Sequence, residues 1–161
     1  MRRVVVVGPG AAGKSTLARA LGEVTGIPVT ELDQLFWRPG PTATPKEEWA
    51  AVQAGRVARP AWILDGDLGP YDVIEVRLRA ADTVVFLDFS LARCAWRAAR
   101  RSRENADFWR WLLTYRHRSR PALLAAIAAH APAARLCVLR TPRAVRRFLA
   151  DARQQTAGAG D

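Results

Sequence analysis

The sequence has 161 residues and a formal net charge of +10; half of the residues are hydrophobic and a quarter are charged. This length and composition predict one globular domain over residues 1–153, with a polar, glycine-rich tail over residues 154–161 that we expect to be disordered. No apolar run approaches the ~18 residues of a membrane span, and the run Val4–Val7 ends too early for a secretory signal. Cys94 and Cys137 lack metal-ligand spacing, which favours a cytoplasmic protein with free thiols.

The first predicted element is a buried strand over Arg3–Val7 that runs directly into Gly8–Thr16, with the sequence GPGAAGKST. This segment fits the pattern G-x-x-x-x-G-K-[S/T] of a phosphate-binding loop, in which backbone N–H groups surround a polyphosphate. Lys14 can reach the β- and γ-phosphates, the Ser15 hydroxyl can bind Mg²⁺, and the helix that follows adds its positive dipole end. The residues expected to contact a nucleotide are Gly8, Gly10, Ala11, Ala12, Gly13, Lys14, Ser15 and Thr16.

Four further apolar, β-branched runs follow, and helical patterns separate them. This alternation is typical of crossover units and a parallel sheet, an α/β fold. The first helix is predicted from Lys14 to about Thr25. A second is predicted near Pro45, where Thr44 can cap the helix and Glu47 can complete a capping box. The further strand-like runs are Pro28–Leu32, Ala61–Leu64, Thr83–Leu87 and Arg135–Leu139.

The positive charge is concentrated after the fourth run. Only two of the 25 basic residues are lysine, and nine arginines lie between Arg93 and Arg120, against Glu104 and Asp107 as the acidic residues. A basic surface can bind nucleic acid or a small polyanion. Concentration in one segment favours a local site over a general coating.

Two polar residues can cap helices of this half, namely Ser90 and Asn105, and Thr141-Pro142 is expected to start the last helix. After Asn105, four apolar side chains recur at i, i+3, i+4 and i+7, which predicts that they face the core rather than a nucleotide base. These side chains are Phe108, Trp111, Leu112 and Tyr115. We expect Pro121 to interrupt the pattern before a helix that continues to His130.

Several segments together resemble one family. The phosphate loop, LDQLFW after the second strand, WILDGD in the third and LRTPRAVRRFL near the end are similar to segments of topology modulation proteins, small P-loop kinase-like relatives of adenylate kinase. The resemblance extends from Arg3 to about Ala150. It implies a three-layer αβα fold with five parallel strands in the order 2-3-1-4-5, a short arginine-rich helical lid, and phosphoryl transfer from ATP with Mg²⁺.

The resemblance also implies roles for charged residues near the loop. Asp65, at the end of the third strand, would hold Mg²⁺ through water, although it could instead cap the turn before Gly66. Arg97 and Arg101, four residues apart on the helix leading into the lid, would contact the adenine and the transferring phosphates, respectively. Further candidates for the same cluster, which could equally form a solvated surface, are Arg100, Arg103, Arg116, Arg118 and Arg120.

The acceptor side is less defined. Asp33 follows the second strand, where sugar and shikimate kinases of this architecture place a carboxylate on the acceptor hydroxyl, so it could be a general base or only a turn-forming residue. Arg77 matches an arginine that the family has near its acceptor, which favours an anionic group. Trp37 and Phe36 could stack on an acceptor or pack in the core.

One segment departs from the resemblance. The family usually has GNY followed by arginine after the third strand, whereas this chain has GDLGPY over Gly66–Tyr71. Asparagine is replaced by Asp67, and the arginine is missing. We include Gly66 and Asp67 among the expected acceptor-binding residues, but the departure argues against a standard mononucleotide acceptor.

The leading prediction is an ATP- and Mg²⁺-dependent kinase that phosphorylates a small acceptor bearing an anionic group or a hydroxyl. One alternative is a nucleotide-sensing regulator that binds nucleic acid, which the charge favours but no recognisable nucleic-acid motif supports. Another is a kinase of antibiotics or secondary metabolites. We expect a cytoplasmic monomer or weak homodimer.

Overall fold

A parallel β-sheet forms the centre of the computed structural model, which describes residues 1–40, 42–101 and 106–158. Its five strands lie in the order β2-β5-β1-β6-β7, and each neighbouring pair is parallel. Counting these five strands alone, this is the predicted order 2-3-1-4-5. The strands are β1 Arg3–Val7, β2 Val29–Glu31, β5 Trp62–Asp65, β6 Thr83–Leu87 and β7 Arg135–Leu139. All five predicted strands are confirmed, with ends that agree within one or two residues.

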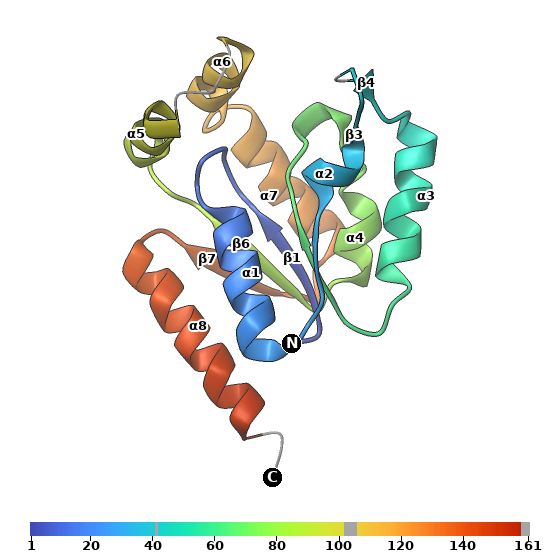
Figure 1. Ribbon diagram of the computed structural model, residues 1–161, viewed down its shortest axis with the longest axis vertical. Helices are drawn as coiled ribbons and strands as arrows, with labels where there is room; N and C mark the ends of the chain where they lie inside the picture. The colour runs from blue at the N-terminus through green and yellow to red at the C-terminus, as the bar shows by residue number, and fades with distance from the viewer. Residues whose placement is uncertain (41, 102–105, 159–161) are drawn as a thin grey trace.

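Helices cover both faces of the sheet, which gives the three-layer αβα architecture (Figure 1). On one face lie α1 (Lys14–Thr25) and α8 (Pro142–Ala157). On the other face lie α3 (Lys46–Val57), α4 (Glu75–Ala80) and α7 (Ser119–His130). The two termini of the described chain lie at the end of the sheet opposite the phosphate loop (Figure 1).

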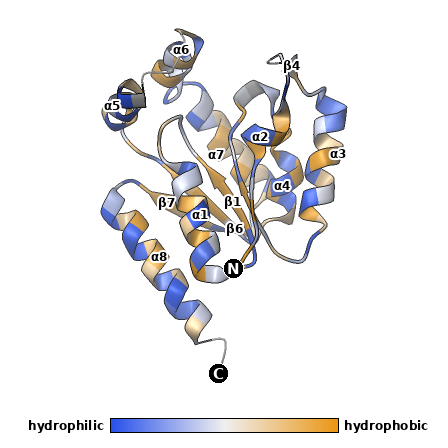
Figure 2. Ribbon diagram, viewed as in Figure 1, coloured by the Kyte–Doolittle hydropathy of each residue, from blue (hydrophilic) through white to orange (hydrophobic). Residues whose placement is uncertain are grey.

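The central strand connects the two cores because its side chains alternate between the faces of the sheet. Val4 and Val6 pack in the core under α1 and α8, whereas Val5 and Val7 pack in the core under α3, α4 and α7. All four valines are fully buried. A strand that is buried on both faces is expected to be a continuous apolar run, and Figure 2 shows the apolar colour concentrated on these central strands.

Short elements gather beyond the carboxyl ends of the strands (Figure 1). They are α2 (Leu32–Phe36), the antiparallel pair β3 (Trp37–Arg38) and β4 (Thr42–Ala43), a 3₁₀ helix (Gly69–Tyr71), α5 (Leu91–Arg101) and α6 (Ala106–Thr114). Ligands of open α/β sheets bind at this edge. Neither α2 nor the β3–β4 pair was predicted from the sequence, because elements of two to five residues are too short to show a periodic pattern.

The predicted cap at Ser90 is present, and Thr141, predicted to start the last helix, also caps it. The Ser90 hydroxyl accepts a hydrogen bond from the Arg93 backbone N–H at 3.4 Å, and the Thr141 hydroxyl accepts one from the Ala144 N–H at 3.1 Å. Pro121, predicted to interrupt the helical pattern, lies in the first turn of α7. The other cap predicted in this half, Asn105, lies outside the described residues.

The predicted cap of α3 is wrong. Thr44 is buried, and its hydroxyl donates a 2.5 Å hydrogen bond to the Phe36 carbonyl, so it connects α3 to α2. The residue in the cap position is Pro45, and it makes no side-chain cap.

The last helix is longer than expected. Because α8 ends at Ala157, residues 154–157 are helical rather than part of a disordered tail. Within the described ranges, no helix is both long enough and apolar enough to cross a membrane.

Candidate functional site

The phosphate-binding loop connects β1 to α1 at the carboxyl edge of the sheet. Its backbone shape depends on glycine at two places: Gly8 has φ +145° and Gly13 has φ +94°. A Cβ on Gly8 would lie 2.5 Å from the Leu87 carbonyl oxygen, so a side chain there would collide with β6. Helix α1 begins directly at Lys14. The free N–H groups of its first turn therefore face the space that the loop encloses, as in an anion site.

Lys14 and the lid helix α6 lie on the open side of this loop. The Lys14 ammonium donates a 3.2 Å hydrogen bond to the Pro9 carbonyl, which holds the side chain along the loop. A Cβ on Gly10 would lie 2.5 Å from the Phe108 ring and 2.7 Å from the Trp111 ring. Helix α6 therefore packs directly against the loop, and a side chain at this position would displace the Phe108 and Trp111 rings.

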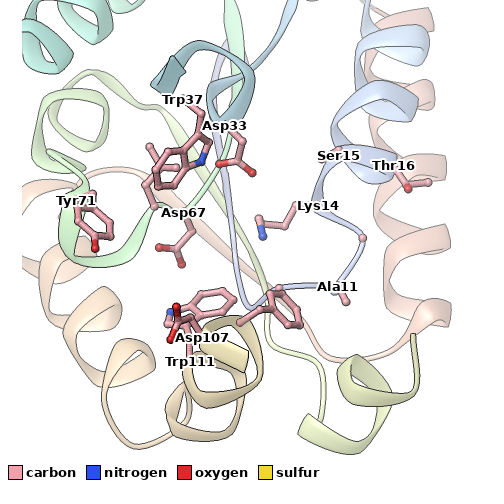
Figure 3. Close-up of a pocket in the computed structure, with 14 residues that line it drawn as sticks. Ala11, Lys14, Ser15, Thr16, Asp33, Trp37, Asp67, Tyr71, Asp107 and Trp111 are labelled. Carbon is pink, nitrogen blue, oxygen red and sulfur yellow. The ribbon is translucent and has the colours of Figure 1, made fainter. Parts of the chain in front are cut away.

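A cavity of about 560 Å³ extends from the loop between α2, the segment after β5, and α6. Figure 3 shows Lys14 pointing into the space between Asp33 and Asp67, with Trp37 on one side and Trp111 and Asp107 on the other. The lining residues are Gly10, Ala11, Gly13, Lys14, Ser15, Thr16, Asp33, Trp37, Asp67, Leu68, Tyr71, Asp107, Phe108 and Trp111. Most of the predicted loop residues thus line the same cavity as Asp33, Trp37 and Asp67.

Asp33 lies in the first turn of α2, just past the end of β2, and opens onto the cavity. The register explains its position: Glu31 of β2 pairs with Asp65 of β5, which in turn lies next to Val6 of β1. Asp33 is exposed at the edge of the cavity, but the surrounding walls displace part of its water, which raises its pKa above the ordinary value, and the attraction of Lys14 only partly opposes this shift. A carboxylate with a raised pKa at this place can accept a proton from a group held in the cavity.

Asp65 ends β5 beside the loop and is only 3% exposed. Burial raises its pKa, while Lys14 and a hydrogen bond from the Ser15 side chain act in the opposite direction. Its Oδ1 atom is buried and has no hydrogen-bond partner within the described parts of the chain. Buried polar atoms normally have partners, and a carboxylate next to a hydroxyl is a donor set that suits Mg²⁺. The residues present therefore fit this metal.

Asp67 lies two residues past Asp65 and belongs to the cavity wall. Its Oδ1 accepts a 3.2 Å hydrogen bond from the Gly69 backbone N–H, which fixes the side chain. Burial raises the pKa of Asp67, and Lys14 opposes the shift. Gly66, predicted alongside it, does not line the cavity. It has φ +153°, and its carbonyl accepts a 2.9 Å hydrogen bond from Arg77.

The prediction that Arg77 contacts an acceptor does not agree with its position. Arg77 is 0% exposed, and its guanidinium pairs with Asp72 through two hydrogen bonds of 2.6 and 2.8 Å. It also donates to the Gln53 side chain at 2.9 Å and to the Gly66 carbonyl. Burial alone would raise the pKa of Asp72, but the attraction of Arg77 lowers it below its ordinary value. Arg77 thus stabilises the segment that carries Asp67 without reaching the cavity.

Arg97 of α5 lies against the back of the phosphate loop. Its guanidinium donates a 2.9 Å hydrogen bond to the Ala12 carbonyl and lies about 3.1 Å from where a Cβ on Gly13 would be. It borders a smaller cavity of about 230 Å³ between the loop and α8, whose walls include Leu17, Pro142 and Val145. The other predicted lid arginine, Arg101, ends α5, and its side chain lies outside the described part of the structure.

The remaining arginines of the cluster diverge. Arg120 pairs with Asp88 through two hydrogen bonds of 2.9 Å, and this pairing lowers the pKa of Asp88. Arg100 lies over the exposed Trp96 ring at 4.8 Å from its centroid. Arg116 and Arg118 are exposed, and Arg103 lies outside the described residues. The segment therefore does not form one site.

The aromatic residues were assigned only partly correctly from the sequence. Phe36 is buried, whereas Trp37 is 46% exposed and lines the cavity. Leu112 and Tyr115 of the α6 region are buried as predicted. Phe108 and Trp111 are half-buried and pack against the core as predicted. They also form a wall of the cavity, which the helical spacing did not reveal because it identifies a shared face but not everything that the face contacts.

Known proteins resemble this chain in fold. No protein-family model matches the sequence, and no curated protein sequence is significantly similar to it. A shikimate kinase from Acinetobacter baumannii, solved with shikimate, superposes with a TM-score of 0.68 at 19% identity over 99% of this chain and 94% of that one. A sugar kinase from Janibacter sp. gives a TM-score of 0.58 at 21% identity, covering 96% and 91% of the two chains. A gluconokinase from Sinorhizobium meliloti gives 0.56 at 17% identity, covering 98% and 93%. The chain therefore has the fold of small P-loop kinases.

The position of Arg77 generates a stability prediction. Arg77→Met should lower the free energy of unfolding by about 3–5 kcal/mol, because it leaves the Asp72 carboxylate buried without its partner. Urea unfolding measures this change. Arg79→Met, an exposed arginine on the same helix, is the matched control and should change stability by less than about 0.5 kcal/mol. A stable Arg77→Met protein would show that the guanidinium is not structural.

The raised pKa of Asp33 generates a pH-dependent prediction. The folded state binds the Asp33 proton more tightly than the unfolded state does, so ionisation of this group lowers stability as pH rises through the raised pKa. Asp33→Asn should therefore unfold at a higher temperature than the unchanged protein at neutral pH. The difference should disappear as the pH falls below the ordinary aspartate range.

Asp88→Asn is the control of opposite sign. Because Arg120 lowers the pKa of Asp88, this substitution should destabilise the protein at neutral pH and have less effect in acid. Thermal unfolding of both variants between neutral and acidic pH measures the two effects. If Asp33→Asn instead lowered the stability at neutral pH, the pKa of Asp33 would not be raised in the folded protein.

Proposed function

We propose that this protein is an ATP- and Mg²⁺-dependent phosphotransferase that transfers the γ-phosphoryl group to a hydroxyl of a small acceptor. The observation that carries the proposal is that Asp33 and Lys14 face one cavity of about 560 Å³ at the phosphate loop. One side of this cavity suits a polyphosphate, and the other offers a carboxylate that can accept a proton. A carboxylate in this place serves a hydroxyl acceptor better than a phosphate acceptor, which is already anionic.

The nucleotide would use both sides of the phosphate loop. Its phosphates would bind to the backbone N–H groups of Gly8–Thr16 and to Lys14, which would leave its contact with Pro9. Its adenine would bind in the 230 Å³ cavity behind the loop, between Arg97 and the start of α8. The apolar walls and the guanidinium of that cavity suit a flat aromatic base.

Mg²⁺ would be held by the Ser15 hydroxyl and, through water, by Asp65. The unpartnered Asp65 Oδ1 supports this assignment. When bound, the ion neutralises charge on the phosphate oxygens.

The chain's own residues would account for the acceptor chemistry. Asp33 orients the acceptor hydroxyl and takes its proton while the oxygen–phosphorus bond forms and the bond to the β-phosphate breaks. Lys14 stabilises the negative charge on the transferring oxygens. Phe108 and Trp111 cover the loop and reduce access of water, which limits hydrolysis.

Asp33→Asn tests the proposed base. The amide keeps the size of the side chain but cannot accept the proton, so kcat for the true acceptor should fall by roughly 10²–10⁴. Slow hydrolysis of ATP by water should change much less, because Lys14, Ser15 and Asp65 remain. Transfer of labelled γ-phosphate, measured against a panel of hydroxylated metabolites, gives both rates.

The pattern of the kinetic constants distinguishes the alternatives. A near-normal kcat with a raised KM for the acceptor would mean that Asp33 only binds the acceptor, and the base assignment would be lost. The expected thermal stability of the Asp33→Asn protein ensures that a loss of rate does not reflect unfolding.

Arg97→Ala tests the proposed adenine site. Loss of a charged side chain that contacts the loop and lines this cavity should raise KM for ATP about tenfold or more and change kcat less. Arg100→Ala, on the same helix and stacked on Trp96, is the matched control and should leave both constants unchanged. Equal effects of the two substitutions would argue against an adenine site beside Arg97.

A further inference from the structure

The 560 Å³ cavity at the phosphate loop carries an excess of negative charge on its proposed acceptor side. Among the described residues that line it, Asp33, Asp67 and Asp107 are carboxylic acids, and Lys14 is the one cationic side chain. Lys14 belongs to the phosphate loop and would be occupied by the nucleotide. An acceptor in this cavity would therefore meet three carboxylates and the phosphates, with no cationic group of the described wall left to pair with an anion.

Arg77, the arginine that the sequence placed at the acceptor, instead forms a buried ion pair with Asp72. Arg77 and Asp72 are 0% and 3% exposed in their side chains and pair with each other. The Asp67 carboxylate accepts a hydrogen bond from the Gly69 N–H and interacts with the buried Tyr115 hydroxyl, which leaves part of its capacity of about four acceptor positions unused. Asp67 therefore keeps an acceptor oxygen for a ligand in the cavity.

Aromatic rings surround the same space. Trp37 and Tyr71 form one side, with ring centroids 6.3 Å apart, and both are unusually exposed for their size at 46% and 57%. Phe108 and Trp111 form the other side, with centroids 6.0 Å apart. Aromatic faces attract organic cations, and exposed rings around a cavity mark a binding surface.

We infer that the phosphoryl acceptor is a hydroxylated organic cation, such as an amino sugar, an aminocyclitol or an amino alcohol. The inference rests on the proposed kinase function and specifies its substrate class. The ammonium group lies between Asp67 and the rings of Trp37 and Trp111, and a hydroxyl faces Asp33. This arrangement pairs the excess carboxylate with charge on the ligand, whereas an acidic metabolite would place like charges together in a partly enclosed site.

Binding of three charge classes tests the inference independently of turnover. The cationic class is glucosamine, 2-deoxystreptamine and ethanolamine; the neutral class is glucose, myo-inositol and glycerol; the acidic class is gluconate, glucuronate and shikimate. Each is titrated by calorimetry into the full chain with Mg²⁺ and a non-hydrolysable ATP analogue, at a pH at which the amines are protonated. The best cation should bind about tenfold or more tightly than the best member of either other class.

Substitution of one wall carboxylate identifies the cause of the preference. Asp67→Asn keeps an oxygen that can accept from the Gly69 N–H, so the local backbone should be preserved. It should weaken cation binding by about tenfold or more and leave binding of neutral compounds within about twofold. Asp107→Asn removes a second charge from the cavity wall and should also weaken cation binding. Asp107 is exposed on α6, so this substitution should not disturb folding. Asp151→Asn, exposed on α8, is the matched control and should change neither.

The outcomes separate the inference from the function on which it rests. If the ATP analogue binds but an acidic compound binds best, or no cation binds, the substrate class is wrong and the kinase proposal stands. If cations bind equally well to the unchanged protein, Asp67→Asn and Asp107→Asn, the carboxylates do not recognise the acceptor and the inference is overturned. If the ATP analogue itself fails to bind, the proposed function fails and the inference fails with it.

Discussion

The buried pair of Arg77 and Asp72 holds together the segment between β5 and α4, which forms part of the wall of the proposed acceptor site. Asp72 accepts hydrogen bonds from Arg77 on α4, from Trp49 and Gln53 on α3, and from the Leu68 backbone N–H. Arg77 in turn holds the Gly66 carbonyl. These contacts connect two helices to both ends of the segment between β5 and α4. A fully buried ion pair is costly unless its hydrogen bonds are satisfied, and here nearly all of them are.

The two aspartates of this short segment differ in their surroundings: Asp72 belongs to the buried ion pair, whereas Asp67 faces the cavity. Asp72 is saturated with donors, and its pKa is lowered; Asp67, in the same loop, retains capacity to accept, and burial raises its pKa. Asp33 and Asp65 also have pKa values raised by burial. Carboxylates that are gathered in this way without enough internal partners lower stability. Such an arrangement is expected where a site must bind cations, metal ions or protons that the folded chain alone does not supply.

How much of this was predictable from the sequence depends on the range of each interaction. The strands, the phosphate loop and the positions of Asp33 and Asp65 follow from local patterns, because a parallel sheet brings the ends of its strands to one edge. The pairing of Arg77 with Asp72 could not be read from a pattern, since an arginine beside a site looks the same whether it faces a ligand or a buried carboxylate. The presence of aspartate five residues before Arg77 was a signal, but not a decisive one.

The error at Thr44 and the incomplete prediction for Phe108 and Trp111, which pack against the core and also line the cavity, have the same origin. Thr44 is a residue type that often caps helices, but its hydroxyl donates instead to the buried Phe36 carbonyl. The local sequence does not show that this carbonyl lies nearby. The spacing of Phe108 and Trp111 correctly placed them on one helix face with Leu112. Which part of that face meets the core and which part meets a cavity depends on where α6 crosses the phosphate loop, and this is a tertiary property.

These separate origins explain how a P-loop kinase fold can accommodate different acceptors. The proposed nucleotide side depends on the loop between β1 and α1, in which Gly8 lies against β6 and Gly10 lies against α6. The proposed acceptor side is formed by α2, the segment after β5, and α6, all of which lie outside the central sheet. Substitutions there can change the charge of the cavity without disturbing the sheet. At this low identity, similarity to shikimate kinase and gluconokinase shows the fold and not the acceptor, and we propose that the carboxylates and rings of this wall select it.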